Sequence, residues 1–162
     1  MADYVEVAKI SGVSTLGIVL GYGVETTAGT KPATFTGLDR INAIGGIAIN
    51  SETIDSSALY DLVTRTIRGR GDTGGTWTVT VNFTPETKTQ WAAVLSAYSA
   101  LTEGKRMWFE VIIPTFEDAF FVVAQPPTAL PMPEMGQNSL LTVEMTLTIE
   151  EYIGMDTKVD FT

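Results

Sequence analysis

The side chains in this chain that are most capable of chemistry are carboxylates, because the sequence contains no histidine and no cysteine. Thiol nucleophiles, histidine-based general bases, Cys/His zinc sites and disulfides are therefore excluded. Two kinds of enzyme remain open, an acid protease and a hydrolase with a carboxylate-bound metal ion. Both need carboxylates that converge in one site, and Asp72 and Glu117 are the residues to test for such a role.

The segment from Gly69 to Gly74, with the sequence GRGDTG, carries several motif-like patterns at once. It fits a dinucleotide-binding fingerprint, but a strand pattern follows it where the motif needs a helix N-terminus for the pyrophosphate. Its DTG triplet matches the aspartic proteases, but the chain has no second copy and no apolar strand around the triplet. Its RGD tripeptide is a chance occurrence. We therefore interpret the segment as a glycine-rich turn.

Length and charge narrow the function further. A chain of 162 residues is typical of a single domain, and 44% hydrophobic with 18% charged residues favours a packed core over disorder. The chain has ten Lys and Arg and 19 Asp and Glu, which give it a net charge of -9. This charge disfavours binding of the protein to nucleic acid or to an anionic membrane surface. No targeting segment is visible at the start of the sequence, so we expect synthesis in the cytoplasm.

Periodic patterns predict a mainly β fold with one helix. The sequence contains 24 threonines, a β-branched residue that favours strands. Residues 76–84 alternate apolar and polar side chains, as do residues 140–151. A helix is expected from Pro85 to Gly104, with Thr84 as its N-cap.

The remaining strands are expected around this helix. Segments 106–113 and 116–124 predict a hairpin, and the second of them is apolar at both alternate positions, which indicates cover on both faces. A further strand is expected at 47–49, after a bend at Gly45-Gly46.

Three segments have weak patterns and are interpreted as projections from one domain that spans residues 1–162. They are an N-terminal arm at 1–40, a long polar loop at 51–75 and a C-terminal tail at 152–162. The charged residues of the polar loop are Asp55, Asp61, Arg65, Arg68, Arg70 and Asp72.

Two polar rows accompany the clearest strands. A solvated sheet face explains them most simply, and the sharper alternative is that they line an aqueous space shared between molecules. The rows are Thr76, Thr78, Thr80 and Asn82 on one strand, and Thr142, Glu144, Thr146, Thr148 and Glu150 on the other.

The order of these segments from Ile41 to Glu150 resembles the major tail tube protein of long-tailed, siphovirus-like bacteriophages. The resemblance rests on the ordered set: the stretch IAINSETIDSS at 47–57, the polar excursion, the strand at 76–83, the helix from Pro85, strands at 107–113 and 120–124, and the stretch LTVEMTLT at 141–148.

The resemblance implies a tail-tube fold, a β-sandwich or half-barrel with one flanking helix and extended arms. It implies a structural virion protein without cofactor, metal or enzymatic activity. Six copies would form a ring, rings would stack into the tube that delivers DNA into the host cell, and the 51–75 region would reach the adjacent ring. Expected partners are further copies of the chain, the tape measure protein, the tail terminator and baseplate or tip proteins, and the expected location is the virion tail.

An acidic wall suits such a channel, because DNA slides best past a surface that repels phosphate. We therefore expect the two polar rows, with Glu144 and Glu150, to face the lumen, and we expect DNA to pass without specific binding. Other self-assembling roles remain open: a tail terminator, a capsid decoration protein or a secretion-system tube. An enzyme ranks far below these.

Overall fold

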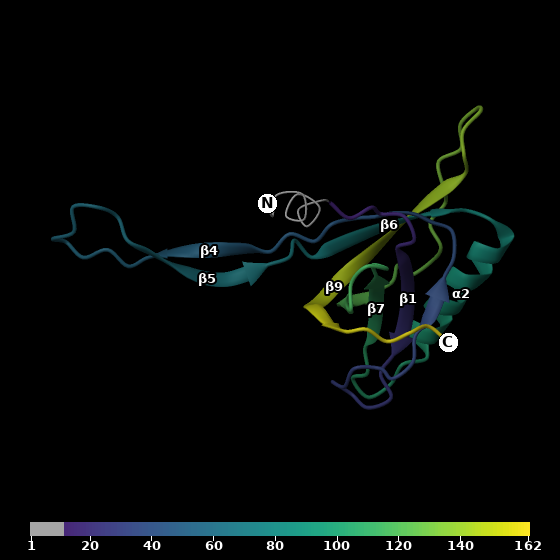
Figure 1. Ribbon diagram of the computed structural model, residues 1–162, viewed down its shortest axis with the longest axis horizontal. Coiled ribbons are helices and arrows are strands. Elements are labelled where there is room, and N and C mark those ends of the chain that lie inside the picture. Colours follow the sequence, from purple (N-terminus) through teal and green to yellow (C-terminus); the bar gives the residue numbers. More distant parts are fainter. Residues whose placement is uncertain (1–11) are drawn as a thin grey trace, which may run out of the picture.

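The computed structural model describes residues 12–162 and places nine strands and one helix within that range (Figure 1). The part of the predicted N-terminal arm at residues 1–11 lies outside the described residues. The elements in chain order are β1 (Val19–Val24), β2 (Thr36–Leu38), β3 (Ile41–Ile44), β4 (Asn50–Asp55), β5 (Thr66–Asp72), β6 (Thr76–Asn82), α2 (Pro85–Ser99), β7 (Met107–Ile112), β8 (Asp118–Gln125) and β9 (Thr142–Thr157).

Seven strands form one antiparallel sheet in the order β2-β1-β7-β8-β9-β6-β3. The long strand β9 belongs to two parts of this sheet: Thr142 to Thr148 pair with β6, and residues from Thr148 to Thr157 pair with β8. The sheet therefore turns about β9 into two layers, with the main core between them. This arrangement confirms the predicted mainly β fold with one flanking helix.

The main core is built from the alternate side chains that the sequence pattern predicted. Trp77 and Phe109 meet edge to face across it, with ring centroids 6.0 Å apart. Other core residues are Val79, Val81, Val111, Val122, Val143, Met145 and Leu147.

Helix α2 adds Trp91 and Val94 to this core. Its start is as predicted, because the Thr84 side chain accepts a hydrogen bond from the N–H of Thr87 at 3.2 Å. The predicted end of the helix was wrong, because the helix ends at Ser99. Gly104, which was predicted to end it, lies in a separate turn with a φ of 74°. In residues 12–162 no helix is long and apolar enough to cross a membrane.

Strand β8 is covered on both faces, as its apolar sequence predicted, and the neighbouring strand β7 is covered on both faces as well. One face belongs to the main core. The other carries a second apolar cluster that includes Trp108, Phe121 and Val123, packed against Phe35 and Phe161. Burial on both faces favours apolar residues at successive positions, which explains the apolar run from Ala119 to Ala124 in β8.

The prediction of an N-terminal arm was wrong for residues 19–38, because β1 lies inside the sheet between β2 and β7. Leu20 is fully buried. The glycines that suggested a broken segment are sites of close packing: a Cβ on Gly21 would lie 2.5 Å from the Phe161 ring, and one on Gly23 would lie 2.7 Å from the Thr34 carbonyl oxygen.

The predicted polar tail at 152–162 is also corrected. Strand β9 continues to Thr157, and the residues after it cross the outer face of the sheet (Figure 1). Glu110 accepts a hydrogen bond from the Val159 N–H at 2.8 Å, and the Thr162 N–H donates to the Phe35 carbonyl at 2.9 Å. The chain end is thus held by contacts to residues far away in sequence, which its polar composition did not reveal.

Glu110 makes the stability of this region depend on pH. Its side chain is fully buried and its Oε2 atom has no hydrogen-bond partner, so burial raises the pKa of this carboxyl above the ordinary 4.5, despite the bond from Val159. A raised folded-state pKa means that stability is lost as pH rises from about 4.5 through the folded value.

We expect Glu110→Gln to raise the melting temperature at pH 7 by a few degrees, because the amide oxygen keeps the Val159 bond without a buried charge. The difference from the unmodified protein should vanish near pH 4, where both side chains are neutral. Thermal unfolding at a series of pH values measures this. An equal effect of the substitution at both pH values would show that charge burial is not the cause.

Candidate functional site

The candidate catalytic carboxylates do not converge. Asp72 is exposed at the end of β5, where its Oδ1 atom accepts a hydrogen bond from the Gly74 N–H at 2.9 Å. Glu117 is exposed in the turn between β7 and β8. Among residues 12–162, no group of three Asp or Glu side chains is arranged to hold a metal ion. The carboxylate geometry that either kind of enzyme needs is therefore not found in the described part of the chain.

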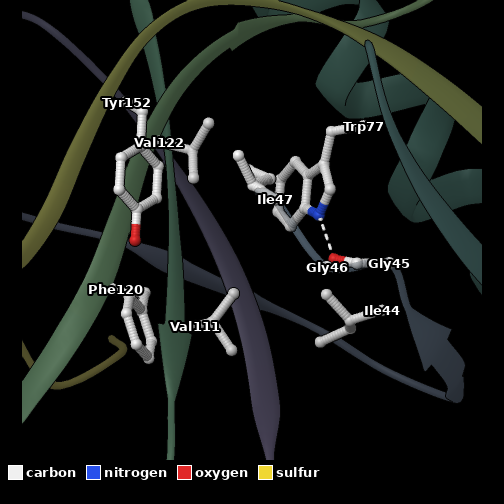
Figure 2. Close-up of a pocket in the computed structure, with 9 residues that line it drawn as sticks. All are labelled: Ile44, Gly45, Gly46, Ile47, Trp77, Val111, Phe120, Val122 and Tyr152. Carbon is white, nitrogen blue, oxygen red and sulfur yellow. Dashed lines mark hydrogen bonds between the residues drawn. The ribbon is translucent and has the colours of Figure 1, made fainter. Parts of the chain in front are cut away.

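A cavity of about 210 Å³ lies between the two layers of the sheet and is lined mainly by apolar side chains (Figure 2). Its walls include Ile44, Val111 and Phe120. The Trp77 indole N–H points toward it and donates to the Gly45 carbonyl at 2.7 Å. Among residues 12–162, the Tyr152 phenol is the only ionisable group that lines this space, so the described lining offers apolar volume without the groups of an active site.

The two polar rows lie side by side on one face of the β6–β9 pair. Thr76 lies opposite Thr148, Thr78 opposite Thr146, and Thr80 opposite Glu144. The intervening residues of both strands point into the core, so the rows occupy the opposite face. Neither strand contains a Lys or Arg, so this face is acidic and hydroxyl-rich.

The ends of the two rows continue the same surface. The Asn42 side chain of the neighbouring strand β3 donates to the Asn82 side chain at 3.0 Å. At the other end, Glu150 accepts a hydrogen bond from Gln125 at 2.9 Å, next to an irregularity in the β8–β9 register. The structure thus brings all nine predicted residues together, and their role as a channel lining stays a prediction.

The layer formed by β3, β6 and the first half of β9 has an open edge on each side. The Phe83 N–H donates to the Leu141 carbonyl, and the Ile149 N–H donates to the Gly75 carbonyl. Because antiparallel residues alternate between the two neighbours, the odd-numbered residues of this part of β9 bond to β6, and the even-numbered ones turn their backbone groups the other way.

On that other side, β8 ends at Gln125, opposite Thr148. The backbone groups of Thr142, Glu144 and Thr146 therefore find no pairing strand among the described residues. Within residues 12–162, strand β3 likewise pairs with β6 and with no other strand. Open ladders of this kind accept a strand from another chain.

The segment predicted as a long loop at 51–75 is a two-stranded ribbon that projects far from the sheet (Figure 1). We call β4, β5 and the 56–65 turn the arm. The strand expected at 47–49 was wrong, since β3 ends at Ile44 and β4 starts at Asn50. The predicted turn at 69–74 is mostly strand β5, and the positive φ values of Gly74 and Gly75 mark the break before β6. Segment 51–75 is rich in polar residues because both faces of the ribbon are exposed.

The predicted charged residues all lie on this arm, and they do not form one cluster. Asp61 contacts Arg65 at 3.5 Å at the arm tip. Asp55 accepts a hydrogen bond from the Ser57 N–H, which lowers the pKa of its carboxyl. Arg68 and Arg70 are exposed along β5.

The sequence analysis missed an apolar tip on the arm. Leu59, Tyr60, Leu62 and Val63 are 77–109% exposed. Four large apolar residues within five positions of a polar segment were the available signal. An isolated two-stranded ribbon is marginally stable in water, and an exposed apolar tip marks an interaction site. These exposed apolar side chains make the arm tip a candidate contact surface.

Comparisons with known proteins give a fold but no sequence family. No family model matches the chain, and no curated protein matches it. One similar solved structure is a chain of the PVC sheath–tube complex, from an extracellular contractile injection system in its extended state, with 14% identity, a TM-score of 0.62 and coverage of 98% of this chain and 100% of that one.

Two further solved structures are similar. A chain of the PVC sheath/tube terminator has 17% identity and a TM-score of 0.59, with 91% of this chain and 98% of that one covered. A chain from the tail of an empty GTA particle, with C6 symmetry, has 13% identity and a TM-score of 0.57, with 91% and 99% covered.

The likeness establishes a tail-tube fold and confirms the predicted fold class. It is not specific to long-tailed phages, because it extends to contractile injection systems. Two of these neighbours belong to an extracellular contractile injection system, and the third belongs to the tail of a GTA particle.

Proposed function

We propose that this protein is a structural subunit of a tail tube, in which six copies form a ring and the rings stack into a conduit for DNA. The observation that carries the proposal is the layer of β3, β6 and the first half of β9. In the described part of the chain this layer has an edge without a pairing strand on each side, and it has one continuous polar face. A closed ring of copies removes both edges at once.

Lateral pairing would join β3 of one copy to the open part of β9 of the next, so that the layers form one barrel. The six-fold count is supported by the C6 symmetry of the GTA tail, which contains a chain of the same fold. In such a barrel the polar rows line the lumen. Glu144 and Glu150, with no Lys or Arg on either strand, repel phosphate and keep DNA free to slide.

Axial stacking would use the arm, which extends beyond the sheet and carries apolar side chains at its tip. The 51–75 segment then serves as the inter-ring element of a single tube domain. The remaining partners would be a tape measure protein, a terminator and baseplate or tip proteins, and the location would be the tail of a virion assembled in the host cytoplasm.

A tail terminator or a secretion-system tube protein is the second candidate. The observation in its favour is the similarity to the PVC sheath/tube terminator at a TM-score of 0.59. A terminator forms a single ring, and the arm distinguishes the two roles, because a lone ring has no adjacent copy for an apolar tip to contact.

Negative-stain electron microscopy of the purified protein, at rising concentration, tests the proposal. We expect annuli and open tubes of one diameter. Single rings at every concentration would favour the terminator, and a particle that stays monomeric at all concentrations, even when seeded with preformed tail tips, would contradict both.

The lumen assignment has its own test, because the chain has no native cysteine to interfere. Thr146→Cys should react with a long maleimide-polyethylene glycol in the unassembled protein and become at least tenfold slower to react in tubes. Thr115→Cys, in the exposed β7–β8 turn, is the control and should react at similar rates in both states. If assembly slows the maleimide reaction equally at the two positions, the polar rows do not line the lumen.

A further inference from the structure

The last five residues of the chain cross the outer face of the sheet as a separate segment (Figure 1). Residues 158–162 follow the end of β9 and belong to no strand of the sheet, and we call them the strap. Their one pairing contact is an isolated bridge between Phe161 and Phe35. The strap can therefore leave the sheet without breaking the hydrogen-bond ladder of any strand pair.

The Phe161 ring is the apolar anchor of the strap. A Cβ on Gly21 would lie 2.5 Å from this ring and one on Gly37 would lie 3.0 Å from it, so the ring fills the space that the two glycines leave open. The Thr162 N–H adds one backbone bond, to the Phe35 carbonyl at 2.9 Å. Phe161 is only half-buried and Thr162 is exposed, so opening of the strap costs far less than unfolding of the core.

Glu110 of β7 lies beneath the strap and is its third attachment point. The cross-strand neighbours of Glu110 are Gly21 of β1 and Phe121 of β8, and neither side chain is polar. The Oε1 atom of Glu110 accepts the hydrogen bond from the Val159 N–H at 2.8 Å, and its buried Oε2 atom has no partner among the described residues. An ionised carboxylate in this position is costly, because one of its oxygens has neither water nor a donor.

The charged groups near Glu110 do not remove this cost. Lys158 and Asp160 belong to the strap itself, and Lys31 precedes β2. The Lys31 ammonium forms its ion pair with Asp156, at 3.4 Å, rather than with Glu110. Burial outweighs the two cations, and the Asp160 charge acts in the same direction as burial, so the pKa of Glu110 lies above its ordinary value.

We propose that the strap is a pH-responsive latch, closed over the sheet when Glu110 is protonated and open, with the sheet still folded, when Glu110 is ionised. Opening admits water to the carboxylate and uncovers the apolar surface of Phe35 and Phe121. The inference goes beyond the proposed tube function. The strap lies against β1, β7 and β8, whereas the open edges belong to the layer of β3, β6 and the first half of β9.

The direction of the response follows from the position of Glu110 in the two states. In the open strap the carboxyl is hydrated and titrates near its ordinary pKa of 4.5, whereas in the closed strap its pKa is higher. The open population therefore grows as the pH rises from about 4.5 to the closed-state pKa, and it is constant above that value. Each unit of difference between the two pKa values changes the ratio of open to closed strap about tenfold.

Hydrogen–deuterium exchange of the unassembled full-length protein tests the latch. Glu110→Gln is compared with the unmodified protein at each pH, so that the effect of pH on the exchange chemistry cancels. Near pH 8 we expect the strap amides of the unmodified protein to exchange about tenfold faster than those of Glu110→Gln. Near pH 4 the ratio should approach one, because both side chains are then neutral.

Asp160→Asn is the matched control, because it removes an exposed carboxylate of the strap itself. This variant should keep the full pH response. The amides of Val143 and Leu147 in the main core report global unfolding, and their exchange should not follow that of the strap. Phe161→Ala removes the apolar anchor and should speed strap exchange at every pH, since the anchor carries no charge.

Three results would overturn the latch. Equal strap exchange in the unmodified protein and Glu110→Gln near pH 8 would show that the Glu110 charge does not open the strap. Loss of the pH response in Asp160→Asn would assign the response to the strap carboxylate. Core amides that exchange in step with the strap would show global unfolding instead of local opening. None of these measurements depends on the formation of rings or tubes.

Discussion

A variant without the arm should form rings and no tubes, with a loss of stacking that is complete rather than partial. In this variant a two-residue Asn-Gly turn replaces residues 51–71, joining Asn50 to Asp72, which are already opposite each other in the β4–β5 register. The arm strands carry no buried side chain, so their removal leaves the core unchanged. We expect the melting temperature to stay within a few degrees of the unmodified protein.

Electron microscopy and thermal unfolding, performed on the same sample, measure both halves of this prediction. A variant with Thr53→Ser and Thr66→Ser, at exposed positions within the arm strands, is the control and should stack normally. If the shortened chain still forms long tubes, the arm is not needed for the stacking of rings. A large fall in melting temperature would show that the arm stabilises the body.

Proline substitution in β9 should separate lateral assembly from folding. Glu144→Pro removes an N–H that points away from β6 toward the open edge, so the ladder within the subunit stays intact. Val143→Pro removes an N–H that bonds to β6 and also alters a side chain that is 2% exposed. We expect Glu144→Pro to remain folded and to lose rings and tubes, because a neighbouring strand cannot bond to that position.

The paired variant shows that position in the ladder, and not proline itself, decides the result. Val143→Pro should cost about 3 kcal/mol or more of folding free energy, from the lost ladder bond and lost packing. Chemical denaturation measures the free energy of unfolding, and gel filtration with electron microscopy measures assembly. If the Glu144→Pro variant forms rings at normal yield, the lateral contacts between subunits do not use the open edge of β9.

Much of the local structure could be predicted from the sequence. Alternation in β6 and β9 identified which side chains enter the core and which form the polar rows, because burial of one sheet face imposes a period of two. Thr84 and Pro85 fixed the start of α2 for a similarly local reason, since a cap acts on the first turn alone. The apolar residues of β8 at both alternate positions indicated cover on both faces.

Other features depend on contacts between residues distant in the chain. Gly21 and Gly23 suggested a flexible arm, and their role in packing against Phe161 and Phe35 becomes visible only when the C-terminal residues lie over β1. The arm was expected as a loop because its exposed strands lack the contrast between a buried and a solvated face.

The sequence by itself determined the period of each strand, the start of the helix, the acidic charge and the absence of histidine and cysteine chemistry. Tertiary structure alone decided that β9 changes partner from β6 to β8 near Thr148, which leaves two edges open on one layer. It also placed Leu95 and Tyr98 of α2 beside Pro126 and Pro127, and these residues together line a groove. Hydrophobic periodicity follows from local burial, whereas strand partners and surface grooves follow from how distant segments pack, which no single segment encodes.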